Sequence, residues 1–109
     1  MKVKGNIWVE GKKGAFIGIG RMRLLEKIKE HGSIRVAARS MKMSYRQAWE
    51  LINSMNRQSS KPIVETATGG VGGGGTLVTK EGEKAIKYYK ELRERFDKFI
   101  KSEKGKIIF

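Results

Sequence analysis

The stretch from Gly32 to Asn53 reads GSIRVAARSMKMSYRQAWELIN and carries two helix-start signals, eleven residues apart. Ser33 and Ser44 each stand where a hydroxyl can accept from the free N–H groups of a first helical turn. The spacing leaves room for a short helix, roughly residues 33–41, then a tight turn and a second helix over roughly residues 44–57. This order predicts a helix-turn-helix, a motif that usually binds DNA.

Small and apolar residues between the two serines indicate how the helices cross. Ala37 and Ala38 allow a close approach, while Ile34, Met41 and Met43 supply apolar contacts. The pattern therefore predicts a tightly packed helix pair.

An earlier helix is predicted over residues 21–31. Met22, Leu25 and Ile28 recur at helical spacing, and Gly32 is a residue type that commonly follows a helix end. The three helices form the predicted core.

Two short strands are expected before these helices. Residues 2–10 alternate weakly, residues 11–14 form a turn cluster, and residues 15–19 are apolar. The pattern indicates a small hairpin.

The helix over residues 44–57 has distinct faces. Ala48, Ile52 and Met55 fall on one side at a rotation of about 100° per residue, so we expect them to face inward. The residues of this helix expected to bind DNA are Ser44, Tyr45, Arg46, Gln47, Trp49, Glu50 and Asn53, and its polar outer face is expected to read bases.

Individual roles follow from hydrogen-bonding chemistry. Arg46 suits guanine, and Gln47 or Asn53 suits adenine. Trp49 has two open interpretations: packing in the core or at its rim, or contact with a thymine methyl or sugar. The whole face also has an alternative interpretation as a solvated surface.

Strong positive charge favours a polyanionic partner. The formal net charge is +13, and residues 80–104 hold nine Lys/Arg against six Asp/Glu, so most of the excess lies elsewhere. An anionic membrane surface is the second choice, and no apolar run approaches membrane length. Double-stranded DNA is therefore the expected partner, without a membrane.

A glycine-rich loop separates two predicted strands. Residues 63–66 and 77–79 suit strands, and the loop over residues 68–76 holds six of the fourteen glycines. Such a wing brings bare N–H donors close to a phosphate backbone, although a flexible linker has the same composition. The predicted phosphate contacts are Ser33, Arg35, Lys42, Arg57, Thr68, Gly70, Gly72 and Gly73.

The same glycines match G-x-G-x-x-G through Gly70, Gly72 and Gly75. A dinucleotide site needs a strand-to-helix turn here, whereas the chain continues as strand, so we reject that interpretation. His31 lacks a nearby histidine or carboxylate pattern for metal or acid–base chemistry. We expect no catalytic activity, no metal and no cofactor.

The last helix is predicted over residues 80–102, with Thr79 as N-cap. Its apolar residues recur at threes and fours, and it extends beyond what a three-helix core can cover, so we expect a homodimer. The alternative is that the stripe covers the N-terminal strands of its own chain. The predicted dimer-interface residues are Ile86, Tyr89, Leu92, Phe96, Phe99 and Ile100.

The fold class expected is mainly α with small β, an α+β winged helix-turn-helix with a long C-terminal dimerisation helix. Residues 1–79 hold the hairpin, helices and wing, and residues 80–109 the long helix and tail, as one structural module. There is no cysteine, and the start lacks a signal-peptide pattern, so the expected location is the cytoplasm.

Taken together, the segments GSI (32–34), SYRQAW (44–49), INSMN (52–56) and VETATGGVGGGG (64–75) resemble the DNA-binding domain of ModE-type molybdate-dependent transcriptional regulators. The resemblance covers about residues 20–100, and the helix pair alone is also similar to LysR-type domains. It implies a dimer whose recognition helix enters the major groove of a palindromic operator, flanked by the wing.

The chain departs from the family pattern in specific places. Arg46 stands where lysine is expected, Lys42 where a turn glycine is expected, and Val71 where a basic wing residue is expected. Family members sense molybdate through C-terminal oxyanion-binding domains, for which 109 residues leave no room. We therefore expect a stand-alone or split DNA-binding protein that does not itself bind molybdate.

Two other functions compete with a sequence-specific regulator. A non-specific, chromatin-like DNA coater would need only a small basic dimer. A protein-interaction module using the winged fold is disfavoured by the positive charge outside the last helix.

Overall fold

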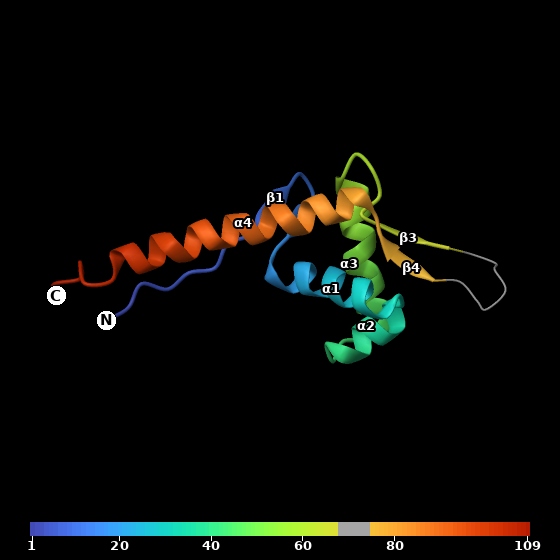
Figure 1. Cartoon of the computed structure of the whole chain (residues 1–109), viewed down its shortest axis with the longest axis horizontal. Helices are drawn as coiled ribbons and strands as arrows, with labels where there is room; N and C mark the ends of the chain where they lie inside the picture. The colour runs from blue at the N-terminus through green and yellow to red at the C-terminus, as the bar shows by residue number, and fades with distance from the viewer. Residues whose placement is uncertain (68–74) are drawn as a thin grey trace.

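The computed structural model describes residues 1–67 and 75–109. Its elements are β1 (Val9–Gly11), β2 (Gly14–Ile17), α1 (Ile19–His31), α2 (Ile34–Ser40), α3 (Tyr45–Gln58), β3 (Val64–Thr66), β4 (Thr76–Val78) and α4 (Lys80–Glu103). Helices α1, α2 and α3 cluster together, and α4 crosses above them and extends beyond them (Figure 1). The fold is an α+β winged helix-turn-helix with a long C-terminal helix, as predicted.

The predicted helix starts and stops are confirmed at their hydrogen bonds. Ser33 Oγ accepts from the Val36 N–H at 3.1 Å, and Ser44 Oγ accepts from the Gln47 N–H at 3.0 Å. Gly32 adopts φ = 65° and its N–H donates to the Ile28 carbonyl at 2.8 Å, ending α1. These local signals fix the end of α1 and the starts of α2 and α3.

Helix α1 begins at Ile19, two residues before the predicted start. The Arg21 guanidinium reaches back to the Phe16 carbonyl at 3.4 Å and across to Ser54 Oγ on α3 at 3.0 Å. Burial lowers the pKa of Arg21 from its ordinary value. The start of α1 therefore coincides with side-chain contacts to β2 and α3, and no local helix-start pattern predicts such contacts.

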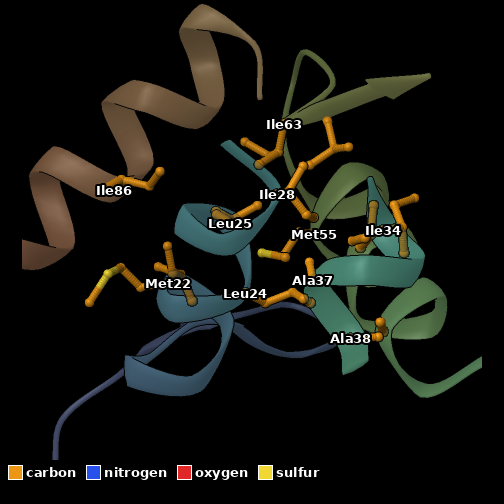
Figure 2. Packing of buried hydrophobic residues seen from close by; sticks show 14 of the residues in the cluster. Met22, Leu24, Leu25, Ile28, Ile34, Ala37, Ala38, Met55, Ile63 and Ile86 are labelled. Carbon is orange, nitrogen blue, oxygen red and sulfur yellow. The ribbon is translucent and has the colours of Figure 1, made fainter. Parts of the chain in front are cut away.

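The core lies between α1, α2, α3 and α4, with the start of β3 at its edge (Figure 2). Ala37 and Ala38 of α2 are buried at the crossing with α3, as their size predicted. Ala48, Ile52 and Met55 of α3 are buried too, so the predicted rotation of α3 is confirmed. The remaining core residues are Ile17, Met22, Leu24, Leu25, Ile28, Ile34, Ile63, Val64, Ile86 and Tyr89.

Strands β3 and β4 form the antiparallel ribbon predicted for the wing. Val64 pairs with Val78 and Thr66 with Thr76. The Thr76 N–H also donates to the Gly32 carbonyl at 3.0 Å, which joins the wing to the turn between α1 and α2. The wing is thus anchored on the helix-turn-helix.

Asn56 fastens the other strand of the wing to α3. Its Oδ1 accepts from the Ile63 and Val64 N–H groups at 2.7 and 3.1 Å, and its Nδ2 donates to the Val64 carbonyl at 3.1 Å. One side chain therefore holds β3 against α3.

Helix α4 starts at the predicted cap, where Thr79 Oγ1 accepts from the Gly82 N–H at 3.1 Å. Its first half covers the core: Ile86 is 5% exposed and Tyr89 fully buried. The prediction that these two residues form a dimer interface is therefore wrong, because their apolar surface is already used within the chain.

Residues 1–8 do not form the strand predicted over residues 2–10; β1 begins at Val9. This segment instead runs beside the far half of α4 (Figure 1). The Tyr89 hydroxyl donates to the Ile7 carbonyl at 2.7 Å, and the Phe96 ring packs against Gly5. Tyr89 and Phe96 therefore contact N-terminal residues of their own chain, although those residues are not the strand that the alternative interpretation expected.

Within the described residues, none of the helices combines the length and apolar character needed to cross a bilayer.

The turn between α2 and α3 contains Lys42 at φ = 57°, in the left-handed region. A side chain in this region costs on the order of 1 kcal/mol relative to glycine. The departure from the family's glycine therefore leaves the turn in place and introduces local strain.

Lys42→Gly is expected to raise the free energy of unfolding by about 0.5–1 kcal/mol by relieving this strain. Urea unfolding followed by circular dichroism measures it. Lys42→Gln is the matched control, since it removes the charge and keeps the strained backbone. Equal midpoints for the two variants would contradict the prediction.

Candidate nucleic-acid interface

The first two turns of α3 present an exposed surface at the end of the molecule formed by α2 and α3. Tyr45 is 41% and Trp49 43% exposed, and the Arg46 side chain is 89% exposed. Trp49 is therefore not buried in the core, while packing at the rim of the core and contact with a thymine methyl or sugar both stay open. Asn53, one turn further, is half-buried.

Arg46 and Glu50 form an ion pair along α3. Arg46 Nε donates to Glu50 Oε1 at 3.1 Å, and both side chains remain largely exposed. An exposed i, i+4 pair contributes only about 0.3–0.5 kcal/mol to stability. Its structural effect is orientation, because the bond through Nε leaves the two terminal nitrogens of the guanidinium free to donate.

A second pair joins α2 to α3. The Arg35 guanidinium lies over the Tyr45 ring, 4.6 Å from its centroid. Arg35 is exposed, so its charge is accessible while its position is fixed by the ring. Arg35, Lys42 and Arg46 thus bring positive charge to the exposed side of the helix-turn-helix.

The serine hydroxyls predicted to contact DNA are already used as caps. Ser33 and Ser44 each accept a hydrogen bond from their own helix. A hydroxyl hydrogen remains available on each, so the capping role leaves one donor for a phosphate.

Arg57 lies at the opposite end of α3 from Arg46. It lines a cleft of about 700 Å³ together with residues of the β1–β2 hairpin and the start of α4. Eleven residues of helix separate Arg57 from Arg46, a rise of about 16 Å. The structure does not bring Arg57 together with the exposed surface around Arg46.

The wing residues predicted to contact phosphates, Thr68, Gly70, Gly72 and Gly73, lie outside the described residues. The described part, β3 and β4, lies beside α3 (Figure 1).

Sequence reasoning missed Asn56, which positions the wing. Its partners Ile63 and Val64 are seven and eight residues away across a loop. Asparagine near a helix end commonly bonds to nearby backbone groups, but nothing in the spacing indicates which strand it holds.

Among residues 1–67 and 75–109, no cluster of three or more His, Cys, Asp or Glu side chains is arranged to hold a metal ion. The buried residues of this part of the chain include no charged or polar side chain.

An antiparallel wing beside a capped helix-turn-helix defines a winged helix-turn-helix protein. No family model matches the chain. Curated relatives nevertheless cover most of it, and several of them are named ModE. The transcriptional regulator ModE of Haemophilus influenzae is 42% identical over 84 residues, which is 77% of this chain and 32% of the relative.

The dual regulator ModE of Escherichia coli K12 is 43% identical over 74 residues, 68% of this chain and 28% of the relative. The molybdenum-pterin-binding protein MopB of Rhodobacter capsulatus is 38% identical over 91 residues, 84% of this chain and 34% of the relative. The chain is a ModE-type N-terminal domain, as its motifs predicted. It spans about a third of the length of the curated relatives it matches. The more distant likeness to LysR-type domains stays a prediction.

Proposed function

We propose that this chain is a sequence-specific DNA-binding transcriptional regulator that acts as a homodimer. The observation that carries the proposal is the exposed first half of α3, where Tyr45, Arg46 and Trp49 project while Ala48 fixes the opposite face in the core. A helix held this way can enter a major groove about 12 Å wide. The regulators named ModE among its relatives support the same role.

Base readout falls to the exposed polar residues of α3. Arg46 donates through its two terminal nitrogens to guanine O6 and N7, with Glu50 holding the guanidinium. Gln47 or Asn53 pairs with adenine. Ser44 and Lys42 lie at the start of the helix and contact the phosphate backbone.

Phosphate contacts on the flanks set the register. Arg35 and Ser33 contact the backbone from α2, and Arg57 does so from the far end of α3. Thr68, Gly70, Gly72 and Gly73 are proposed to contact the neighbouring backbone. The net charge of +13 supports strong electrostatic attraction to DNA.

Arg46→Ala is expected to weaken binding to a preferred site by about 1–3 kcal/mol and to relax one base preference, because a bidentate contact to guanine is lost. Fluorescence anisotropy on the wild-type site and on its single-base variants measures both effects. Lys87→Ala is the matched control, since it removes one exposed positive charge from α4. Equal affinities of the two variants for the preferred site would show that Arg46 does not recognise a base.

Dimerisation is proposed to use the distal arm, defined as residues 1–6 together with residues 93–109. Phe99 is 56% exposed here, and Met1, Val3, Ile100 and Ile107 line an adjoining cleft of about 430 Å³. The molecule measures 63 × 28 × 21 Å, and the arm projects along the long axis (Figure 1). Phe96, Phe99 and Ile100 remain in the proposed interface, with Leu92 at its border with the core.

Phe99→Glu is expected to convert the dimer to a monomer at micromolar concentration, because it places a charge in an apolar contact. Sedimentation equilibrium measures the mass. Tyr88→Glu is the control: Tyr88 is 53% exposed but lies on the half of α4 that covers the core, so this variant should stay dimeric. Monomers in both cases would contradict an interface confined to the arm.

These 109 residues are proposed not to bind molybdate themselves. The part matched in MopB is 34% of that protein, so the binding in its name can belong to the remainder. Isothermal titration of this chain with molybdate is expected to give no heat of binding, and a tight stoichiometric isotherm would overturn the proposal. We propose no catalytic activity and a cytoplasmic location, which a DNA-bound regulator requires.

A non-specific DNA coater is the second candidate, favoured by the high net charge. Such a protein needs no exposed aromatic and hydrogen-bonding side chains on one helix. The surface formed by Tyr45, Arg46 and Trp49 supports the regulator over the coater.

A further inference from the structure

Two parallel rows of side chains run along the exposed side of α3. One row holds the aromatic rings of Tyr45 and Trp49, and the neighbouring row holds the ion pair of Arg46 and Glu50. Both rows have i, i+4 spacing, and they lie about 100° apart around the helix. A notch of about 390 Å³ lies between them, lined by these four residues.

We propose that this notch is a thymine site, which receives the C5-methyl group of a thymine in the major groove. The inference rests on the proposed function, since it takes α3 to be the helix that enters the groove. It assigns Tyr45 and Trp49 together to one ligand group, the thymine methyl, and predicts a thymine beside the base that Arg46 reads.

The chemistry of the groove leaves few alternatives. Base edges in the major groove carry hydrogen-bond donors and acceptors, and the thymine methyl is the apolar group among them. Tyr45 and Trp49 are each more than 40% exposed, so part of each ring remains in water in the free chain, although Arg35 lies over the Tyr45 ring. Covering them with a methyl group removes apolar surface from water on both sides.

The dimensions also fit one position of the duplex. Tyr45 and Trp49 are separated by a rise of about 6 Å along α3, less than two base steps of about 3.4 Å. The notch therefore faces one thymine or two adjacent ones. The Arg46 guanidinium, held at the rim by Glu50 at 3.1 Å, faces the next base pair.

The test compares thymine with deoxyuridine, which lacks only the methyl group. A preferred site is first selected from a random DNA pool, and each thymine in it is then replaced singly by deoxyuridine. Binding of wild-type protein is expected to weaken about fourfold at one or two positions in each half-site, the effect of one buried methyl.

The protein variants assign the effect to the notch. Trp49→Ala should bind the thymine and deoxyuridine duplexes equally, while Arg46→Ala should bind both more weakly and keep the fourfold ratio. Tyr45→Phe retains the ring and should also keep the ratio. Circular dichroism of each variant checks that the helices are intact.

The outcomes separate the two proposals. If no preferred site is recovered, the proposed function fails. If a preferred site is recovered but no deoxyuridine weakens binding, or if Trp49→Ala keeps the ratio, the thymine site is overturned and the regulator proposal stands.

Discussion

Ala48→Asp is expected to unfold this protein at room temperature, with a loss of about 4 kcal/mol or more in the free energy of unfolding. Ala48 lies on the inner face of α3 and is 0% exposed, next to Ile52 and Met55. An aspartate there would bury a carboxylate in an apolar core. A small domain has only about 5–15 kcal/mol of stability, so the loss is a large share of it.

Thermal and urea unfolding followed by circular dichroism measure this change. Gln47→Asp is the matched control, since it adds the same charge one residue earlier on an exposed position. That variant should unfold near the wild-type midpoint, helped by an acidic residue in the first helical turn. Similar midpoints for the two aspartates would show that α3 is rotated from the position described.

Gly82→Ala is expected to lower the free energy of unfolding by about 3 kcal/mol, at the upper end of overpacking substitutions. Gly82 is buried in the first turn of α4, where the helix crosses the wing. A Cβ atom there would lie inside contact distance of the Ile63 carbonyl oxygen and Val78 Cγ1. Because one of these atoms is backbone, the contact cannot be relieved by a rotamer change.

Gly20→Ala is the control for this substitution. Gly20 lies in the first turn of α1, and a Cβ built there meets no atom within 4 Å. Alanine should therefore stabilise α1 by up to about 1 kcal/mol through helix propensity alone. Opposite shifts in urea midpoint are predicted for the two variants, and equal shifts would contradict the close approach of α4 to the wing.

The parts of the fold that sequence predicted depend on local chemistry. A serine or threonine cap is predicted from the residue itself and the helical turn that follows it. The left-handed Gly32 at the end of α1 is predicted from that single glycine. The rotation of α3 followed from the spacing of Ala48, Ile52 and Met55. These interactions join residues about four positions apart or fewer, so the amino-acid sequence alone is enough to predict them.

The parts that sequence did not predict depend on contacts between distant residues. Tyr89 is buried in the core, and its hydroxyl donates to the Ile7 carbonyl, 82 positions away. The position of Tyr89 in the apolar stripe of α4 does not show whether the residue packs in the core of its own chain or in a dimer interface. The close approach of Gly82 to the wing and the hydrogen bonds of Asn56 to β3 likewise join separate elements that no local pattern connects.

The candidate site was predicted in outline, because the rotation of a helix is also a local pattern. Helical rotation identified which side of α3 is exposed, including Arg46 and Glu50. It did not separate the two interpretations of Trp49, because a flanking residue can be buried or exposed depending on which elements pack nearby. The contact of Arg35 with Tyr45 joins α2 to α3, so predicting it requires the crossing angle of the two helices, which the sequence does not give.

The proposed function requires that α3 reads a DNA sequence and that two copies of the chain do so as a symmetric dimer. Selection of bound duplexes from a random pool, using the wild-type chain, tests it most directly. We predict enrichment of an inverted repeat whose half-sites lie about 34 Å apart, bound on the order of 10³-fold more tightly than random DNA. A pool that remains random after selection, with all duplexes bound equally, would contradict the account and favour a non-specific DNA coater.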